Sequence, residues 1–250
     1  FLQNANGPDN VWRNNNAYVN KSIKTNAGVR SPYKYLLKEV VVDSNWPLQE
    51  VPHFAAIELI DKKFDSEKIK ALAKTNGVIG TQLYQWKNHT VLYGKMNHIE
   101  YLKAELALEY PKAEIKTYNT PLYNFDRSER CNDKTMASEW EHILLTANLV
   151  ENESLQNEYI EHHNTQFQKW PEVAQGFCNA NFQQLQVFKN ERQLLLVISI
   201  PKGESLDELN PKTTEGNPRV DQWNTLMKKY QTGIKGTKPN ETWVLLTKLN

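Results

Sequence analysis

Between residues 53 and 125 the apolar residues follow two alternating spacings. Continuous or every-second-position apolar runs are typical of strands, whereas apolar residues three or four positions apart are typical of helices. Gly, Asn and Pro separate the runs and favour turns. The predicted elements are, in order, a strand at 53–60, a helix at 65–75, strands at 78–86 and 90–94, a helix at 99–109 and a strand at 113–125. The order β-α-β-β-α-β is that of a ferredoxin-like unit.

The second half of the chain repeats this order of spacings. The predicted elements are a strand at 142–149, a helix at 152–169 stopped by Trp170-Pro171, strands at 182–188 and 193–200, a helix at 219–234 and a strand at 239–249, with a polar loop at 202–216. Each unit would form a four-stranded antiparallel sheet with helices on one face, which leaves the other face open. We therefore predict an α+β fold in which two tandem ferredoxin-like units form an intramolecular pseudo-dimeric α+β barrel.

The same patterns predict the boundaries of the parts. These are an N-terminal tail and arm at 1–50, a ferredoxin-like domain at 51–125, a charged linker at 126–138 and a second ferredoxin-like domain at 139–250. Within the arm, residues 36–42 could form an added strand or a packed segment. Because both sheets come from one chain, we expect a monomer with an internal pseudo-dimer, and further association stays open.

Composition and charge exclude two classes of partner. The formal net charge is +1, so the chain has no overall field that would attract nucleic acid. The hydrophobic content of 39% is ordinary for a globular protein, and no apolar run reaches the length that crosses a bilayer. We expect no nucleic-acid partner and no membrane-spanning segment.

The opening segment and the cysteines bear on where the chain is located. The chain begins at Phe1 with an Asn-rich stretch that resembles a solvated tail, and we expect an exported protein, either periplasmic or lipid-anchored. Cys131 in the linker and Cys178 in an expected loop could form a disulfide in an oxidising compartment or remain free thiols. Their spacing does not indicate a metal site.

Five motifs occur in a fixed order in the second half. They are Tyr159 followed four residues later by His163-Asn164, then Trp170-Pro171-Glu172, Arg192-Gln193-Leu194-Leu195, Trp223-Asn224 with Met227, and Glu241-Thr242-Trp243. This ordered set resembles the L-rhamnose mutarotase family, and the resemblance extends over roughly residues 141–250. The first half lacks the Tyr-x-x-x-His pair and the tryptophan pair. It is therefore a degenerate unit, expected to supply only the second sheet.

The resemblance implies an isomerase of carbohydrate metabolism that interconverts the α and β anomers of L-rhamnose or a related deoxy sugar. It implies that His163 is the catalytic acid/base and that Tyr159 and Trp223 contact the monosaccharide. No cofactor and no metal are required. Asn224 stands where the family has a second tryptophan, and could hydrogen-bond a sugar hydroxyl.

Two further departures concern the sugar. A substrate-contacting tyrosine that the family places on the second strand falls near Gln184 or Leu185, and Gln184 is taken as the candidate substrate-binding residue. The spacing from His163 to Trp170 is longer than in the compact bacterial enzymes. These departures leave the identity of the sugar open more than they affect the chemistry.

Mutarotation needs one group that protonates the ring oxygen and one that removes the proton of the anomeric hydroxyl. Histidine suits this exchange because its pKa lies near neutrality. Tyr159 and His163 are four residues apart and would share one helix face. The second acid/base group could be Glu161, Glu172, Asp221 or a water molecule; the sequence does not choose between them.

Each candidate also has a structural interpretation. A single histidine on an apolar helix face is more often a core residue than a catalyst, and Tyr159 and Trp223 could be core residues as well. Two alternative functions therefore stay open. One is a non-catalytic carbohydrate-binding protein on the same fold. The other is a member of the wider dimeric α+β barrel class, which includes small monooxygenases and haem proteins.

Overall fold

The computed structural model describes residues 22–24, 39–41 and 51–249. The chain divides into two compact units, 1–51 and 52–250. In the first unit, β1 (Ser22–Lys24) pairs antiparallel with β2 (Glu39–Val41), which lies within the segment 36–42 where an added strand was considered. The other expectations for the N-terminal tail and arm fall outside the described residues. Over the described part of the chain, every helix is too short or too polar to cross a membrane.

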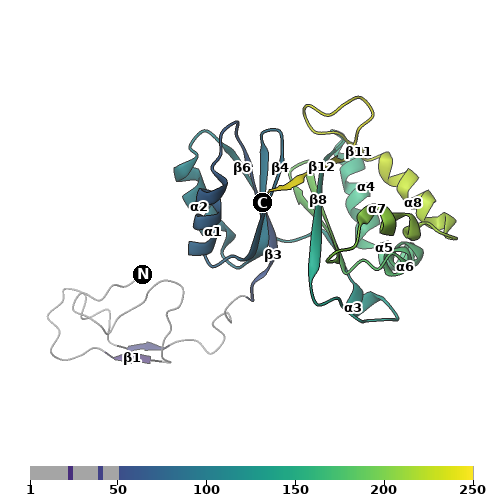
Figure 1. Cartoon of the computed structure of the whole chain (residues 1–250), viewed down its shortest axis with the longest axis horizontal. Coiled ribbons are helices and arrows are strands. Elements are labelled where there is room, and N and C mark those ends of the chain that lie inside the picture. The colour runs from purple at the N-terminus through teal and green to yellow at the C-terminus, as the bar shows by residue number, and fades with distance from the viewer. Residues whose placement is uncertain (1–21, 25–38, 42–50, 250) are drawn as a thin grey trace. The chain divides into compact units, whose positions relative to one another are not determined.

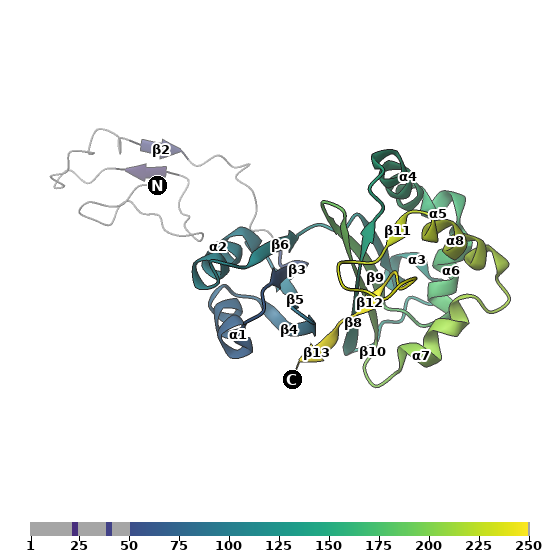
Figure 2. The same ribbon diagram turned by 90° about the horizontal axis from the view of Figure 1, so that it is seen from above.

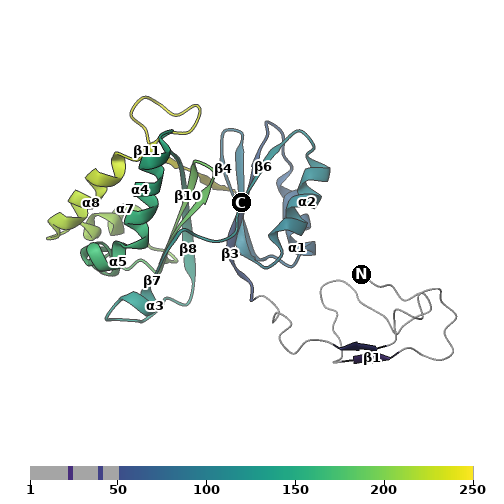
Figure 3. The same cartoon turned by 180° about the vertical axis from the view of Figure 1, so that it is seen from behind.

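The first sheet of the second unit has five strands in the order β13-β4-β5-β3-β6, and all of its pairs are antiparallel. Its strands are β3 (His53–Ile60), β4 (Ile79–Trp86), β5 (His89–Met96), β6 (Glu114–Tyr118) and β13 (Thr247–Leu249). The helices α1 (Ser66–Thr75) and α2 (Ile99–Glu109) cover one face of it (Figures 1 and 3). Asp65 caps α1 by accepting hydrogen bonds from the backbone N–H groups of Glu67 and Lys68.

The second sheet has six strands, with the order β11-β8-β10-β9-β7 and with β12 also paired to β8. The strands are β7 (Tyr123–Asp126), β8 (Trp140–Leu149), β9 (Gln184–Asn190), β10 (Gln193–Pro201), β11 (Gln231–Thr232) and β12 (Val244–Leu245). The helices on its outer face are α4 (Glu153–Asn164), α5 (Gln166–Lys169), α6 (Pro171–Asn179), α7 (Leu206–Leu209) and α8 (Pro218–Lys228).

The two sheets of this unit pack face to face, with their helices on the outside (Figure 2). Buried residues of both sheets form one cluster between them, including Tyr84 and Tyr93 from the first and Leu195 and Val197 from the second. Separate clusters lie between each sheet and its own helices. The predicted α+β class with two tandem ferredoxin-like units is confirmed. Closure of the sheets into a barrel stays a prediction.

Each half gives one strand to the sheet of the other half. The prediction of a single strand at 113–125 is wrong. This segment contains two strands: β6 pairs with β3, and β7 pairs with β9. Pro121 lies at the break and has no N–H to donate to a ladder. The strand predicted at 239–249 also divides, because β12 pairs with β8 and β13 pairs with β4 of the first sheet. The two sheets therefore do not coincide with the two expected domains: β7, from the first half, belongs to the second sheet, and β13, from the second half, belongs to the first.

Several expected helices also differ from the prediction. The helix predicted at 152–169 breaks at Thr165, whose hydroxyl donates to the carbonyl of Glu161 over 2.8 Å. Pro171, expected only to stop that helix, is the first residue of α6, a position that tolerates proline because no intrahelical N–H is needed there. The helix predicted at 219–234 ends at Lys228. The polar loop 202–216 contains α7 and a 3₁₀ helix at Asn210–Thr213.

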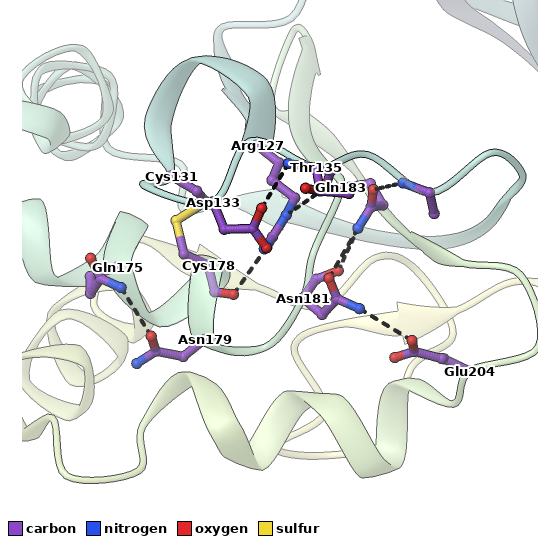
Figure 4. A network of polar contacts seen from close by, with 11 residues as sticks. Arg127, Cys131, Asp133, Thr135, Gln175, Cys178, Asn179, Asn181, Gln183 and Glu204 are labelled. Atoms are coloured by element: carbon purple, nitrogen blue, oxygen red, sulfur yellow. Dashed lines mark hydrogen bonds and ion pairs between the residues drawn. A yellow bond between two sulfur atoms is a disulfide. The ribbon is translucent and has the colours of Figure 1, made fainter.

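A disulfide between Cys131 and Cys178 ties the expected linker to α6 (Figure 4). Cys178 lies in α6 rather than in the expected loop, and its Cα is 5.7 Å from that of Cys131. The buried guanidinium of Arg127 reinforces the connection, since it donates to the carbonyls of Thr135 and Cys178 over 3.0 and 3.1 Å and lies 3.3 Å from the Asp133 carboxylate. The expected linker 126–138 is thus fixed to the helical layer.

Removal of the disulfide is expected to lower the free energy of unfolding by about 2–4 kcal/mol. The bond joins residues that are 47 positions apart, so its loss restores substantial loop freedom to the unfolded chain. Urea unfolding of wild type and of the Cys131→Ser/Cys178→Ser double variant measures the difference. The wild type in reducing buffer should match the variant. Equal midpoints for oxidised wild type and the variant would contradict the prediction.

Candidate active site

A cavity of about 470 Å³ lies between the second sheet and its helices. This volume is within the range of roughly 300–1,000 Å³ that is usual for small-molecule sites. One wall is apolar and comes from alternate residues of the two central strands, Leu185 and Val187 on β9 and Leu196 and Ile198 on β10. The opposite wall comes from α4, α6 and α8.

Helix α4 brings two predicted site residues into this cavity. Its start is set by Asn152, whose side chain accepts a hydrogen bond from the N–H of Leu155 over 3.1 Å. Tyr159 and His163 are one turn apart on the buried face, and their ring centroids are 4.2 Å apart. Both line the cavity, so the predicted juxtaposition on one helix face is observed.

The tautomer of His163 is fixed by the helix itself. Its Nδ1 lies 2.9 Å from the carbonyl oxygen of Tyr159, and because a carbonyl only accepts, Nδ1 carries the proton. The other ring nitrogen, Nε2, then has a free lone pair. Burial lowers the pKa of His163 from 6.5 to about 4, so the ring is neutral at pH 7. His163 is thus a buried neutral base with one nitrogen committed to the backbone.

Trp223 on α8 forms the neighbouring wall. Its ring centroid lies 5.2 Å from that of His163, and Trp170 packs against its other side at 5.7 Å. The guanidinium of Arg219 lies 3.9 Å over the Trp170 ring and keeps the outer indole in place. Asn224, the next residue on α8, also lines the cavity. The structure therefore brings together His163, Tyr159, Trp223 and Asn224.

Gln184 does not line the cavity, and Leu185 does. Side chains of a strand alternate between its faces, so Gln184 shares a face with Gln186 and Phe188. Gln186 accepts a hydrogen bond from Tyr93 of the first sheet over 3.1 Å, and Phe188 belongs to the cluster between the sheets. Gln184 therefore lies outside this cavity, because the strand turns it towards the first sheet.

The candidates for a second acid/base group lie elsewhere. Glu161 is exposed and lies 3.8 Å from Lys169, and the partly buried Glu172 lies 3.7 Å from Arg219. Asp221 is exposed. Among the residues that the structure describes, no Asp or Glu lines the cavity. Its uncharged polar groups come from tyrosine, threonine, asparagine and glutamine side chains and from Trp243.

The polar loop 202–216 contributes more to the site than expected. Its 3₁₀ helix places Asn210 and Thr213 at the cavity, followed by Thr214. Gly176 of α6 permits this approach, since a Cβ at that position would collide with the carbonyl of Thr213. The acidic residues of the loop do not line the cavity.

The cavity residues that were not recognised from the sequence include Trp243, Gln166 and Tyr123. Trp243 belongs to the last motif of the ordered set, and its Nε1–H donates to Gln231 over 3.2 Å. Gln166 lies in the longer spacing between His163 and Trp170. Tyr123 lies on β7, ahead of the segment that carries the motifs. Of these three, only Trp243 had a sequence signal that could have identified it.

Comparison with known proteins gives one family match. A family model described as L-rhamnose mutarotase matches residues 142–249. The L-fucose mutarotase of Xanthomonas campestris pv. campestris is 29% identical over 75 residues, which make up 30% of this chain. The match spans 58% of that relative's own length.

Two solved structures are distantly similar. A monooxygenase-like protein from Listeria innocua has a TM-score of 0.37 and 13% identity, covering 78% of this chain and 94% of that one. An uncharacterized ferredoxin fold protein related to antibiotic biosynthesis monooxygenases, from Listeria monocytogenes 4b F2365, has a TM-score of 0.39 and 10% identity, covering 80% and 96%.

The family match contains the helices that carry His163, Tyr159 and Trp223 and the strands that form the apolar wall. Three of the five motifs that suggested the resemblance contribute residues to the cavity: Tyr159 and His163, then Trp223, Asn224 and Met227, and finally Trp243. Over residues 142–249, the C-terminal half of this chain matches the L-rhamnose mutarotase family, and the resemblance seen in the sequence is confirmed.

Proposed function

We propose that this protein is a sugar mutarotase that interconverts the α and β anomers of L-rhamnose or a related deoxy sugar, with His163 as the acid/base. The observation that carries the proposal is the state of His163. It is neutral, its tautomer is fixed by the Tyr159 carbonyl, and it lies in a cavity of suitable size with one apolar wall. The family match over 142–249 supports the reaction class.

The reaction needs two proton transfers and the breaking and re-forming of the bond between C1 and the ring oxygen. The anomeric hydroxyl gives its proton to Nε2 of His163 while the bond between C1 and the ring oxygen breaks, and the imidazolium so formed passes that proton to the ring oxygen, directly or through water. The product is the open-chain aldehyde, with no net change in atoms or charge. Rotation about the C1–C2 bond and the reverse steps close the ring on the other face. One imidazole, alone or through water, can accept the first proton and return it.

The walls of the cavity suit a sugar with an apolar edge. Trp223 offers an indole face for the C–H groups of a sugar ring. Leu185, Leu196 and Ile198 would bury a methyl group, which is favourable by about 0.8 kcal/mol for each methylene-sized group removed from water. This supports a deoxy sugar over a fully hydroxylated one.

Binding without catalysis is the second candidate function. Two observations favour it: Asn224 replaces a tryptophan of the family pattern, and no carboxylate lines the cavity among the described residues. Such a protein would bind a sugar without changing the rate of anomer exchange. The two functions are therefore separated by measuring exchange and binding on the same sample.

The disulfide supports the proposal that the chain is exported. Disulfides persist in oxidising compartments and are rare in the cytosol. The bond between Cys131 and Cys178 fits an oxidising location such as a periplasm.

Exchange NMR on an equilibrated sugar tests the proposed function. The exchange rate between the two anomeric proton signals is measured for L-rhamnose, L-fucose and other deoxy sugars, with and without the folded protein. Faster exchange of at least one sugar supports the proposal. Binding of a sugar without faster exchange would favour the second candidate, and neither effect from a folded protein would contradict both.

The pH dependence of the exchange rate tests the role of His163. Since the neutral ring is the base and burial lowers the pKa of His163 to about 4, activity should stay level from pH 7 to 5 and fall by half near pH 4. The rate in buffer alone is subtracted at every pH. A fall centred near pH 6.5 would contradict the assignment.

Folding must be checked across the same range by circular dichroism. Burial also lowers the pKa of His142 to about 4, and an unfolded chain protonates its histidines near pH 6.5. The unfolded state therefore binds more protons between pH 6.5 and 4, and stability falls as the pH falls through that window.

A further inference from the structure

The side-chain amide of Gln166 is buried in the cavity wall, and its NH₂ group donates no hydrogen bond to the described residues. The side chain is fully buried and lines the cavity. Within the part of the chain that the structure describes, its Nε2 has no hydrogen-bond acceptor. A buried N–H without an acceptor costs free energy, so such a group calls for a partner that is not part of the fold.

Tyr123 fixes the orientation of this amide. Its hydroxyl donates to Oε1 of Gln166 over 3.2 Å, which leaves the N–H side of the amide as the free side. The Tyr123 ring stacks on Phe167 at 5.3 Å and meets His163 edge-to-face at 5.4 Å. Burial raises the pKa of Tyr123, so its hydroxyl keeps the proton that it donates.

Both residues come from places where this chain departs from the family pattern. Tyr123 lies on β7, outside the matched segment 142–249, and reaches the cavity because β7 pairs with β9. Gln166 lies in α5, within the longer spacing between His163 and Trp170. The tyrosine that the family places on this strand was expected near Gln184 or Leu185, and of these two residues Leu185 is the one that lines the cavity. The cavity thus has an apolar side chain, Leu185, in place of the expected tyrosine hydroxyl, and it gains the phenol of Tyr123 and the amide of Gln166.

We propose that Gln166, oriented by Tyr123, is a specificity-determining residue whose free amide N–H donates a hydrogen bond to one oxygen atom of the bound sugar. The inference rests on the proposed function and deepens it. The ligand would be a deoxy sugar that still carries an oxygen at the position facing Gln166. A sugar that lacks this oxygen would leave the amide unpaired and bind more weakly.

A purely structural role for Gln166 makes a different prediction. If the amide serves only to accept from Tyr123, its loss would destabilise the fold and leave the affinity for sugar unchanged. If it binds sugar, its loss would weaken binding, with a smaller effect on folding because one of its two functional atoms has no partner in the protein.

The test combines the Gln166→Met variant with a set of single-deoxy analogues of the sugar that the wild type exchanges. Methionine has nearly the same length and removes the amide. We expect its dissociation constant for the parent sugar, from NMR titration, to rise by about tenfold, which is the effect of one hydrogen bond. One analogue should bind wild type and variant equally well, and the oxygen that it lacks is the partner of Gln166.

Gln183→Met is the matched control. Gln183 is equally buried, but both ends of its amide are used: Oε1 accepts from the N–H of Ala137 over 2.7 Å, and Nε2 donates to the carbonyl of Asn181 over 2.9 Å. It does not line the cavity. This variant should lose stability in urea and keep wild-type affinity, the reverse of Gln166→Met.

The outcomes separate this inference from the proposed function. A wild type that exchanges sugars, with unchanged affinity in Gln166→Met, would overturn the inference alone. A wild type that neither binds nor exchanges a sugar would overturn the proposed function and this inference with it. If Gln166→Met does not fold, Gln166→Glu takes its place, because it retains the acceptor for Tyr123 and loses the amide donor. Unchanged affinity in that variant would likewise overturn the inference.

Discussion

Replacement of His163 by alanine is expected to lower the protein-dependent rate of anomer exchange by about 10²–10⁴-fold, the usual contribution of one general acid/base. The ring offers a bare Nε2 to the cavity, and no Asp or Glu among the described residues is there to replace it. The variant also loses a buried ring that packs against Tyr159 and Trp223, so its stability must be measured separately. Exchange NMR at saturating sugar gives the rate per folded molecule.

The neighbouring residue provides a matched control. His162 lies on the same helix, but its Nε2 is 3.0 Å from the hydroxyl of Tyr230 and it does not line the cavity. His162→Ala should keep at least most of the exchange rate. Comparable losses in His162→Ala and His163→Ala would point to general damage of α4 rather than to loss of a catalyst. Full activity of a folded His163→Ala protein would exclude His163 as the acid/base.

Local spacing predicted most of the elements because it depends only on residues close in sequence. The two hairpins were expected near their observed turns, and Lys87 and Glu191 each adopt a positive φ there, 52° and 51°. The i,i+4 placement of Tyr159 and His163 followed from helix geometry. The motif order then indicated which helices face the site, and Trp223 and Asn224 do line the cavity, while their contact with a sugar stays a prediction.

The sequence did not predict which face of a strand each side chain occupies or which sheet each strand joins, because both depend on the tertiary fold. A strand turns its side chains to opposite faces at successive residues, so an uncertainty of one residue exchanged Leu185 for Gln184. The exchange of β7 and β13 between sheets leaves no mark in the local spacing of 113–125 and 239–249, because both sheets need the same alternation. Tyr123 could therefore not be assigned to the site, although it reaches the cavity from outside the matched segment.

The interface between the sheets contains a buried carboxylate that no sequence pattern indicated. Glu58 on β3 is fully buried and faces the second sheet. Its oxygens accept from the Tyr118 hydroxyl over 2.8 Å and from the Gln193 amide over 2.9 and 3.0 Å, and Nδ1 of His89 lies 2.7 Å away. Burial and the Glu58 carboxylate raise the pKa of Tyr118, which keeps its donor proton. One carboxylate thus connects the two sheets.

Glu58→Leu is expected to lower the free energy of unfolding by about 3–5 kcal/mol, because removing one partner of a buried charged network leaves the others unpaired. The side chains of His89, Tyr118 and Gln193 would each lose their carboxylate acceptor. Urea unfolding followed by circular dichroism measures the change. Glu58→Gln keeps the shape and one acceptor oxygen, so it should lose less.

A second substitution in the same network tests whether the hydrogen bonds to Glu58 are the cause of the lost stability. Tyr118→Phe removes a hydroxyl whose described hydrogen bond is to Glu58, so it should cost less in the Glu58→Leu background than in wild type. Equal costs in the two backgrounds would show that Tyr118 and Glu58 are not energetically coupled. A Glu58→Leu protein as stable as wild type would show that apolar packing replaces the network. Because Glu58 lies between the two sheets and does not line the cavity, the exchange rate per folded molecule should stay unchanged in every one of these variants. A lower rate would mean that the first sheet does more than cover the second one, and that the two halves act on the sugar together.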